Sequence, residues 1–359
     1  MTTVSRRKLL TRGAELIGVA AVGSAPLALA TPTPGRRIPF GACVNEGAFA
    51  RDVAYRDALT TYCQQVTPEG GLFWAGLRPA RDRFDFEFAD RVQNFAQANG
   101  MTMRGHALVW YAAMPDWTKQ IGSAAEAERE MALHIERVVT RYRGKIKTWH
   151  VVNEPIGDPT GDVAPLRPSI WLRYLGEDYI EKAFRLAHQC DPDAELLLNE
   201  YDVESINAIS TPRRQALLRL IHHLLSRGVP LHGVGLQGHI RGRDEIDGDG
   251  VRSFVAEVQS LGLSVHVTEL DVIDDSLPAP IAARDAIVAA RAYDFLNAIF
   301  AAARPSVIAT WGITDRYTWM PMWYKRKDGQ LNRPLPLDES YRPKPLWSVI
   351  DYFCQRAAS

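Results

Sequence analysis

The sequence has few residues that could ligate a metal or cross-link the chain. Its 359 residues include four cysteines, Cys43, Cys63, Cys190 and Cys354, and no two of them form a C-x-x-C pair. Closely paired cysteines are typical of zinc and redox sites, so we assign no metal and no cofactor to them. An oxidising compartment would permit one or two disulfides, but buried free thiols are the simpler expectation.

An excess of charge of either sign is also lacking. Lys and Arg number 42 and Asp and Glu number 42, so the formal net charge is zero. Nucleic acids and anionic membranes attract basic surfaces, and neither is expected as a partner. A neutral polymer or small neutral ligand fits better, and nine Trp, 12 Tyr and 12 Phe supply rings that could stack on sugars.

Long hydrophobic runs are missing as well, because no stretch reaches the about 20 apolar residues that a membrane-spanning helix needs. Near the N-terminus, Arg6 and Arg7 precede a weakly apolar stretch, 16–29, and a small-x-small cleavage pattern. We interpret residues 1–30 as a twin-arginine-type export signal and 31–36 as a spacer. The mature protein would then be periplasmic or secreted. A membrane anchor is the alternative, which the many small residues disfavour.

From about residue 37, short apolar runs alternate with longer amphipathic segments. Eight of the runs have the length of strands: 38–45, 63–69, 102–110, 148–154, 195–201, 233–240, 264–271 and 307–315. Several are apolar throughout, as in parallel sheets covered on both faces. Because strands alternate with helices and no linker or repeat interrupts them, we predict an α/β fold, a single (β/α)8 TIM barrel over 37–356.

Sequence signals at helix ends support this division. Ser123 to Glu126 is a capping box that begins a helix running to about Gly144. Thr211 and Pro212 predict an N-cap and a first-turn proline. Glycines follow four helical segments, where a left-handed C-terminal cap is wanted: Gly100, Gly144, Gly228 and Gly262.

Polar and aromatic residues gather where the predicted strands end, which is the end of such barrels that carries chemistry. These residues are Asn45, Glu69, His106, Trp110, Asn153, Glu154, Tyr201, Gln237, His239, Glu269, Asp271, Trp311 and Asp315. Glu154 and Glu269 end the fourth and seventh strands, which face each other across a barrel. Glycoside hydrolysis with retention uses two carboxyl groups about 5–5.5 Å apart, one as acid/base and one as nucleophile.

The chain resembles the family 10 glycoside hydrolases, or F-type endo-β-1,4-xylanases, over about residues 36–354. The most specific motifs are Trp149-His-Val-Val-Asn153-Glu154-Pro155 and Val267-Thr268-Glu269-Leu270-Asp271. Three further motifs lie in the expected order on their strands: Arg104 to Trp110, Gly233 to His239, and Trp311 to Trp319.

The resemblance implies a role for each strand-end residue. Glu154 corresponds to the general acid/base and Glu269 to the nucleophile, with His239 and Asp271 orienting Glu269. Asn153 corresponds to the residue that binds the sugar 2-hydroxyl in subsite −1. The others that the resemblance places around the substrate are Glu69, His106, Trp110, Gln237, Trp311 and Trp319, with Tyr201 on the +1 side. This chemistry requires no cofactor.

Several positions depart from the family pattern. Gly70 and Phe73 stand where the family has Asn and Lys, and Tyr111 and Ala113 where it has His and Gln. These changes remove polar groups that in the family hydrogen-bond the hydroxyls of the glycone. We therefore expect an altered −2 subsite. Phe73 and Tyr111 could then supply a stacking wall. His150 replaces an Asp beside His106, so we expect His106 to be protonated less readily.

The leading prediction is an endo-1,4-β-xylanase that binds a β-1,4-linked polysaccharide or oligosaccharide, acts with retention and is a monomer. One alternative is a retaining β-glycosidase of the same fold that acts on a non-xylan or substituted glycan. A second is a non-catalytic sugar-binding barrel. A third, a metal-dependent hydrolase in which His106, His150 and His239 converge, is disfavoured because a metal would compete with sugar binding.

Overall fold

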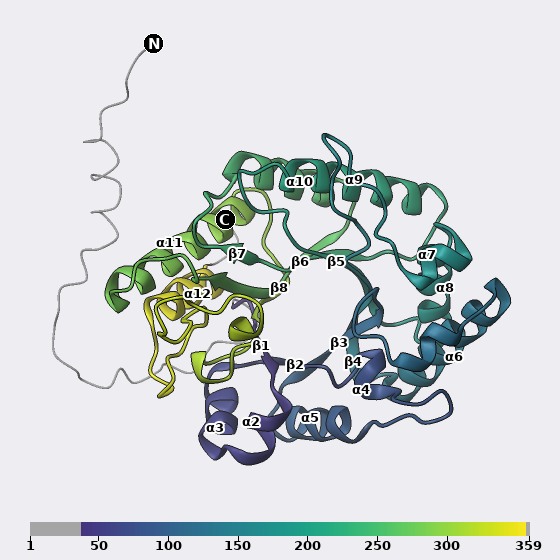
Figure 1. Ribbon diagram of the computed structural model, residues 1–359, viewed down its shortest axis with the longest axis horizontal. Helices are drawn as coiled ribbons and strands as arrows, with labels where there is room; N and C mark the ends of the chain where they lie inside the picture. Colours follow the sequence, from purple (N-terminus) through teal and green to yellow (C-terminus); the bar gives the residue numbers. More distant parts are fainter. Residues whose placement is uncertain (1–36, 357–359) are drawn as a thin grey trace, which may run out of the picture. The chain divides into compact units, whose positions relative to one another are not determined.

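The computed structural model describes residues 37–356, and the predicted export signal and spacer lie outside them. Parallel strands form the centre and helices surround them (Figure 1). The strands are β1 (Phe40–Val44), β2 (Gln65–Pro68), β3 (Thr102–Val109), β4 (Ile146–Asn153), β5 (Glu195–Glu200), β6 (Gly233–Leu236), β7 (His239–Arg241), β8 (Ser264–Ile273) and β9 (Ile308–Thr310).

The sheet closes on itself. Its order is β6-β5-β4-β3-β2-β1-β9-β8-β7, and an additional β6–β8 pairing joins the ends. The predicted sixth strand is divided, because Gly238 has φ 77° and turns the chain between β6 and β7. Both parts pair in parallel with β8. If β6 and β7 are counted as one divided strand, the barrel has eight strands, one for each predicted strand. The (β/α)8 prediction is confirmed.

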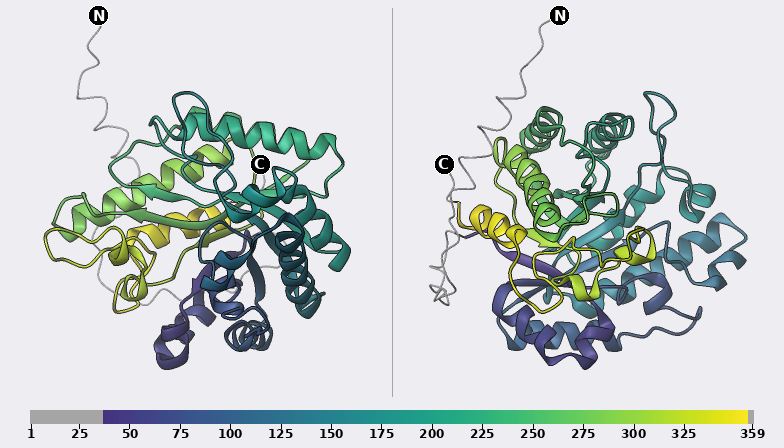
Figure 2. Two further views of the ribbon diagram at one scale, coloured as in Figure 1. Left: turned by 45° about the vertical axis from the view of Figure 1, so that its right-hand side comes forward. Right: turned by 60° about the vertical axis from the view of Figure 1, so that its left-hand side comes forward.

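One longer helix follows each of these eight strands and packs on the outside of the barrel (Figures 1 and 2). These are α3 (Val53–Tyr62), α5 (Glu87–Ala98), α6 (Ala124–Tyr142), α8 (Tyr179–Cys190), α9 (Ser210–Ser226), α10 (Gly248–Ser260), α11 (Ile281–Phe300) and α12 (Pro345–Gln355). Three short helices, α2 (Glu46–Arg51), α4 (Trp74–Leu77) and α7 (Ile170–Leu175), lie in the loops after β1, β2 and β4. A long loop without a regular helix or strand, apart from 3-10 turns, connects β9 to α12.

The signals at helix ends hold in part. Ser123 accepts a hydrogen bond from the Glu126 amide at the start of α6, as the capping box predicts. Thr211 is not the cap of α9, which begins one residue earlier. The side chain of Asn207 instead accepts hydrogen bonds from the amides of Ile209 and Ser210, so the cap lies upstream of the motif.

Two glycines in the barrel strands make room for side chains on neighbouring strands. A Cβ on Gly105 in β3 would lie 2.0 Å from the Trp149 ring, and a Cβ on Gly235 in β6 would lie 2.1 Å from Asn199 Oδ1. Real Cβ atoms do not approach other atoms so closely. Both positions therefore need glycine, so that Trp149 and Asn199 can point toward neighbouring strands.

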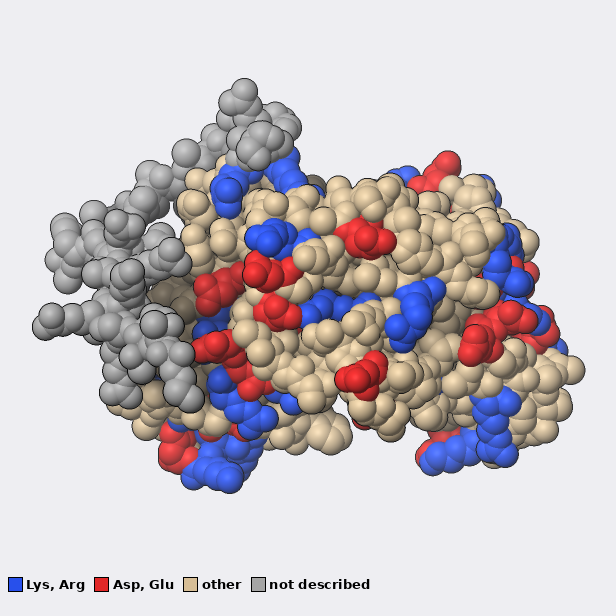
Figure 3. Space-filling model, turned by 90° about the horizontal axis from the view of Figure 1, so that it is seen from above, with Lys and Arg blue, Asp and Glu red and all other residues tan. Residues whose placement is uncertain are grey.

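Three features of the composition have counterparts in the structure. The four cysteines are free; Cys190 is half-buried and the others are buried. Of the helices in residues 37–356, none has the length and apolar character to cross a bilayer. On the face in Figure 3, basic and acidic side chains are interspersed among uncharged surface, in keeping with the zero net charge.

Candidate active site

Glu154 follows β4 directly, and its backbone is held in an unusual conformation. Its φ is 53°, in the left-handed region that non-glycine residues rarely adopt and that recurs at functional sites. Two hydrogen bonds fix it there. The Glu154 amide donates to the Asn199 carbonyl at 2.8 Å, and Arg167 Nε donates to the Glu154 carbonyl at 3.0 Å.

A chain of side-chain amides joins Glu154 to Glu269 on β8. Asn153 Nδ2 donates to Glu154 Oε1 at 3.1 Å. Asn199 Nδ2 donates to both Asn153 Oδ1, at 2.7 Å, and Glu269 Oε1, at 2.6 Å. Gln237 Nε2 lies 3.1 Å from Glu154 Oε1 and closes the network on the other side. The two carboxyl groups are thus positioned by one set of buried amides.

A histidine and a second carboxylate support Glu269. His239 Nδ1 lies 2.7 Å from Asp271 Oδ1, and His239 Nε2 lies 3.3 Å from Glu269 Oε2. The indole of Trp319 donates to the other oxygen of Asp271 at 2.8 Å. Because both ring nitrogens face carboxylates, His239 is held in place as a doubly donating imidazolium.

The pKa values of the two glutamates move in opposite directions. Burial raises the pKa of Glu154, and the negative charge of Glu269 raises it further against hydrogen bonds from nearby groups. Burial also acts to raise the pKa of Glu269, but His106, His239 and Asn199 outweigh it and bring this pKa below its usual range. Burial opposes protonation of His239, yet Asp271 and Glu269 together hold its pKa well above the ordinary value.

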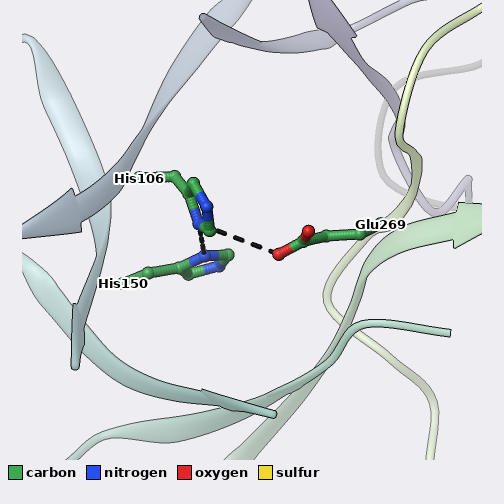
Figure 4. A group of neighbouring side chains, drawn as sticks. All are labelled: His106, His150 and Glu269. Carbon is green, nitrogen blue, oxygen red and sulfur yellow. Dashed lines mark hydrogen bonds and ion pairs between the residues drawn. The ribbon is translucent and has the colours of Figure 1, made fainter. Parts of the chain in front are cut away.

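His106 and His150 lie next to each other and beside Glu269 (Figure 4). Their Nδ1 atoms are 2.7 Å apart, and His106 Nδ1 is also 3.7 Å from Glu269 Oε1. The prediction that His150 lies next to His106 is confirmed. The pKa of His106 is lowered, as expected, but burial is the main cause, and Glu269 acts in the opposite direction.

Aromatic rings form a row along one wall. The ring centroids of Phe73 and Trp110 are 5.0 Å apart, and those of Trp110 and Tyr111 are 5.9 Å apart. Trp110 lies close to Glu154, although its indole N–H makes no well-aligned hydrogen bond. Trp311 also packs against His106, with ring centroids 5.1 Å apart. The substituted residue Phe73 therefore contacts residues at the centre of the site.

The remaining residues predicted for the site occupy its edges. Tyr201 OH accepts a hydrogen bond from Arg167 Nη2 at 2.9 Å, beside the loop that follows Glu154. Glu69 Oε2 accepts one from Asn45 Nδ2 at 2.8 Å, and burial raises the pKa of Glu69.

Two of the polar strand-end residues have structural partners. Asn45 also caps α2 by accepting from the Ala48 amide. Asp315 is buried and its Oδ2 lies 2.8 Å from Lys344 Nζ, within the long loop after β9. Its position at a strand end was therefore a misleading signal for the site.

Two residues of the site were not singled out from the sequence. Asn199 is a buried amide directly after the apolar run of β5, and a polar residue on the buried face of such a strand is the signal that could have found it. Arg167 lies in a loop 13 residues after Glu154, and no local pattern marks it.

Known proteins match this chain over most of its length. The family model described as "Glycosyl hydrolase family 10" matches residues 28–352. The "Endo-1,4-beta-xylanase B" of Paenibacillus barcinonensis is 35% identical over 309 residues, covering 81% of this chain and 89% of that protein.

Solved structures agree as well. The native xylanase 10B from Thermotoga maritima is similar with a TM-score of 0.79 and 32% identity, covering 89% of this chain and 95% of that one. The xylanase 10B from Thermotoga petrophila RKU-1 in complex with xylobiose has a TM-score of 0.78 and 30% identity, covering 99% and 98%. A match over most of the chain, at this identity and with this fold, means that the protein is a glycoside hydrolase and belongs to glycosyl hydrolase family 10.

Proposed function

We propose that the protein hydrolyses internal β-1,4-xylosidic bonds with retention of configuration, using Glu154 as acid/base and Glu269 as nucleophile. The observation that carries the proposal is the single amide network that holds both carboxyl groups while their pKa values move apart. One protonated and one ionised carboxyl group are what a double displacement requires.

In the first step, protonated Glu154 donates to the glycosidic oxygen as the bond to the leaving sugar breaks. A carboxylate oxygen of Glu269 bonds to the anomeric carbon, which leaves a glycosyl-enzyme ester. The amide of Asn153 lies between the two carboxyl groups, where it can hydrogen-bond the 2-hydroxyl of the sugar as charge develops. His239 and Asn199 keep Glu269 ionised and oriented until attack.

In the second step, Glu154 acts as the base. Esterification removes the negative charge of Glu269, which is one of the causes of the raised pKa of Glu154. The pKa of Glu154 therefore falls, and its carboxylate can take a proton from water. That water attacks the anomeric carbon, the ester bond breaks, and Glu269 returns as a carboxylate. The sugar leaves with the configuration it had in the substrate.

Two considerations bear on the substrate. The relatives named above are xylanases, and one was solved with xylobiose bound. A second candidate, a substituted or non-xylan β-glycan, is favoured by Phe73, which stands where the family has Lys and packs against Trp110. A ring at this position replaces a cationic hydrogen-bond donor with an apolar surface.

We also propose that residues 1–30 direct export, so that residues 37–356 act as a monomeric catalytic domain in the periplasm or the medium. The supporting pattern is the pair Arg6 and Arg7 ahead of a weakly apolar stretch. Replacing both arginines with lysine should leave the protein in the cytoplasmic fraction. Normal export of that variant would contradict a twin-arginine signal.

The function is tested by incubating purified protein with xylan, with aryl β-xylobioside and with aryl β-glucoside, alongside Glu269→Ala. We expect xylooligosaccharides in the β configuration from the wild type and none from the variant. Glu269-dependent cleavage of the glucoside without turnover of xylan would favour the second candidate. Turnover of any of them that survives Glu269→Ala would overturn the assignment of the nucleophile.

A further inference from the structure

Three potential metal ligands converge at the base of the site. His106, His150 and Glu269 each offer one ligand atom, these three atoms lie within 4.8 Å of one another, and all three residues are buried. Figure 4 shows the two rings and the carboxylate directed toward a common point. They come from β3, β4 and β8, so only the closed barrel brings them together.

The two imidazoles are not fixed as a fully satisfied hydrogen-bonded pair. One proton can lie between Nδ1 atoms 2.7 Å apart, and it joins two atoms that are both good metal ligands. His150 Nε2 is buried and has no hydrogen-bond partner among residues 37–356. Such atoms are rare in folded proteins. Because the His150 ring is held at one nitrogen only, it can turn without breaking a second bond.

The donor set suits a borderline transition metal. Two imidazoles and one carboxylate are a common catalytic zinc ligand set, with bonds of about 2.0–2.2 Å. Tetrahedral ligands at such bond lengths lie about 3.3 Å apart. The 3.7 Å between His106 Nδ1 and Glu269 Oε1 is near that value, and the Nδ1 atoms would separate slightly.

The protonation states also suit ligation. A hydrogen bond between two Nδ1 atoms leaves one of them as the acceptor, with a lone pair that a metal can use. Moving the shared proton from Nδ1 to Nε2 of its own ring frees both Nδ1 atoms, with no net change in protons. Around the group, the positive charges of Arg104 and His239 are balanced by Glu269 and Asp271.

We propose that His106, His150 and Glu269 form a transition-metal site, and that Zn²⁺ or Cu²⁺ bound there inhibits the enzyme reversibly. The inhibition, though not the binding, rests on the proposed role of Glu269. A metal that occupies its carboxylate oxygen prevents attack on the anomeric carbon and competes with the sugar in subsite −1. Mg²⁺ and Ca²⁺ prefer oxygen ligands and should not bind.

The direct test follows the metal rather than the activity. Metal-free protein is titrated with Co²⁺, whose visible absorption reports tetrahedral nitrogen and oxygen ligation, and Zn²⁺ is then added to displace it. We expect one Co²⁺ per chain, displaced by Zn²⁺ and unaffected by Mg²⁺. Binding should weaken about tenfold or more in His150→Asn and in Glu269→Gln, since each removes a ligand.

The matched control is His222→Asn. His222 lies 3.1 Å from Glu257 on the surface and offers the same chemical groups without a third ligand. Its variant should bind Co²⁺ as the wild type does. The proposal fails if the wild type shows no stoichiometric site, or if binding survives in both site variants. A test of inhibition is separate. Zn²⁺ should raise the apparent KM for aryl xylobioside, and metal binding without any inhibition would instead contradict the role given to Glu269.

Discussion

Asn199 on β5 donates a 2.6 Å hydrogen bond to Glu269 on β8, and β6 lies between these two strands. The same amide nitrogen lies 2.7 Å from Asn153 Oδ1, and Thr268 Oγ1 donates to Asn199 Oδ1 at 2.8 Å. Asn199 therefore fixes the position of the proposed nucleophile relative to Asn153, the residue next to the proposed acid/base. Its own position depends on Gly235, where any side chain would collide with it.

Replacement of Asn199 by Ala should lower kcat/KM on aryl xylobioside by about tenfold to about a hundredfold. A hydrogen bond to a charged group is worth about 1.5–3 kcal/mol, and about 1.4 kcal/mol corresponds to a factor of ten. The control is Asn99→Ala at the exposed end of α5, which should retain full activity. Unchanged kinetics in a folded Asn199→Ala protein would show that the bond does not position Glu269.

The pH dependence should be bell-shaped, with both limbs set by the glutamates. Activity requires ionised Glu269, whose pKa is lowered, and protonated Glu154, whose pKa is raised. The acid limb should therefore lie below the ordinary carboxyl range and the basic limb above it. The measurement is kcat/KM against pH.

His239→Asn should move the acid limb to higher pH. Loss of the imidazolium removes a charge and a hydrogen bond that lower the pKa of Glu269. At a given acid pH, a larger fraction of the protein then carries a protonated, inactive Glu269. His222→Asn, which removes an exposed histidine beside Glu257, serves as the control. If the acid limb stays in place in His239→Asn, a group other than Glu269 titrates there.

Restoring the family residues at the glycone side should strengthen binding of xylooligosaccharides. Gly70 has φ 70°, which Asn tolerates better than most residues, and a Cβ there would have the Phe73 ring as its nearest neighbour, at 4.0 Å. Gly70→Asn with Phe73→Lys should raise kcat/KM on aryl xylobioside by about tenfold to about a hundredfold. A folded double variant that gains nothing would mean that other side chains already bind the glycone.

Gly105→Ala should destabilise the barrel by about 1–3 kcal/mol, because its Cβ would overlap the Trp149 ring. Gly122→Ala is the matched control, since a Cβ there meets only the Gln120 carbonyl oxygen at 4.0 Å. It should change stability by less than about 0.5 kcal/mol. The measurement is the free energy of unfolding in denaturant, and equal effects of the two substitutions would contradict the packing argument.

Much of the architecture was determined by the sequence itself. The alternation of apolar runs with amphipathic segments predicted eight barrel strands, because strand and helix periodicities are local properties of the chain. Glu154 and Glu269 could be chosen because barrel chemistry lies at strand ends, and the motifs around them are specific to the family. Local rules failed at Thr211, where the side chain of Asn207 caps the helix from further upstream.

The tertiary structure decided which of these residues act on one another. Closure of the barrel placed Asn199 between Asn153 and Glu269, and it paired Asp315 with Lys344 instead of the site. It also brought His150 against His106, and within the described part of the chain it left His150 Nε2 without a hydrogen-bond partner. Such contacts join residues tens of positions apart and depend on strand register and on burial. Burial also shifts their pKa values, which no local pattern in the sequence encodes.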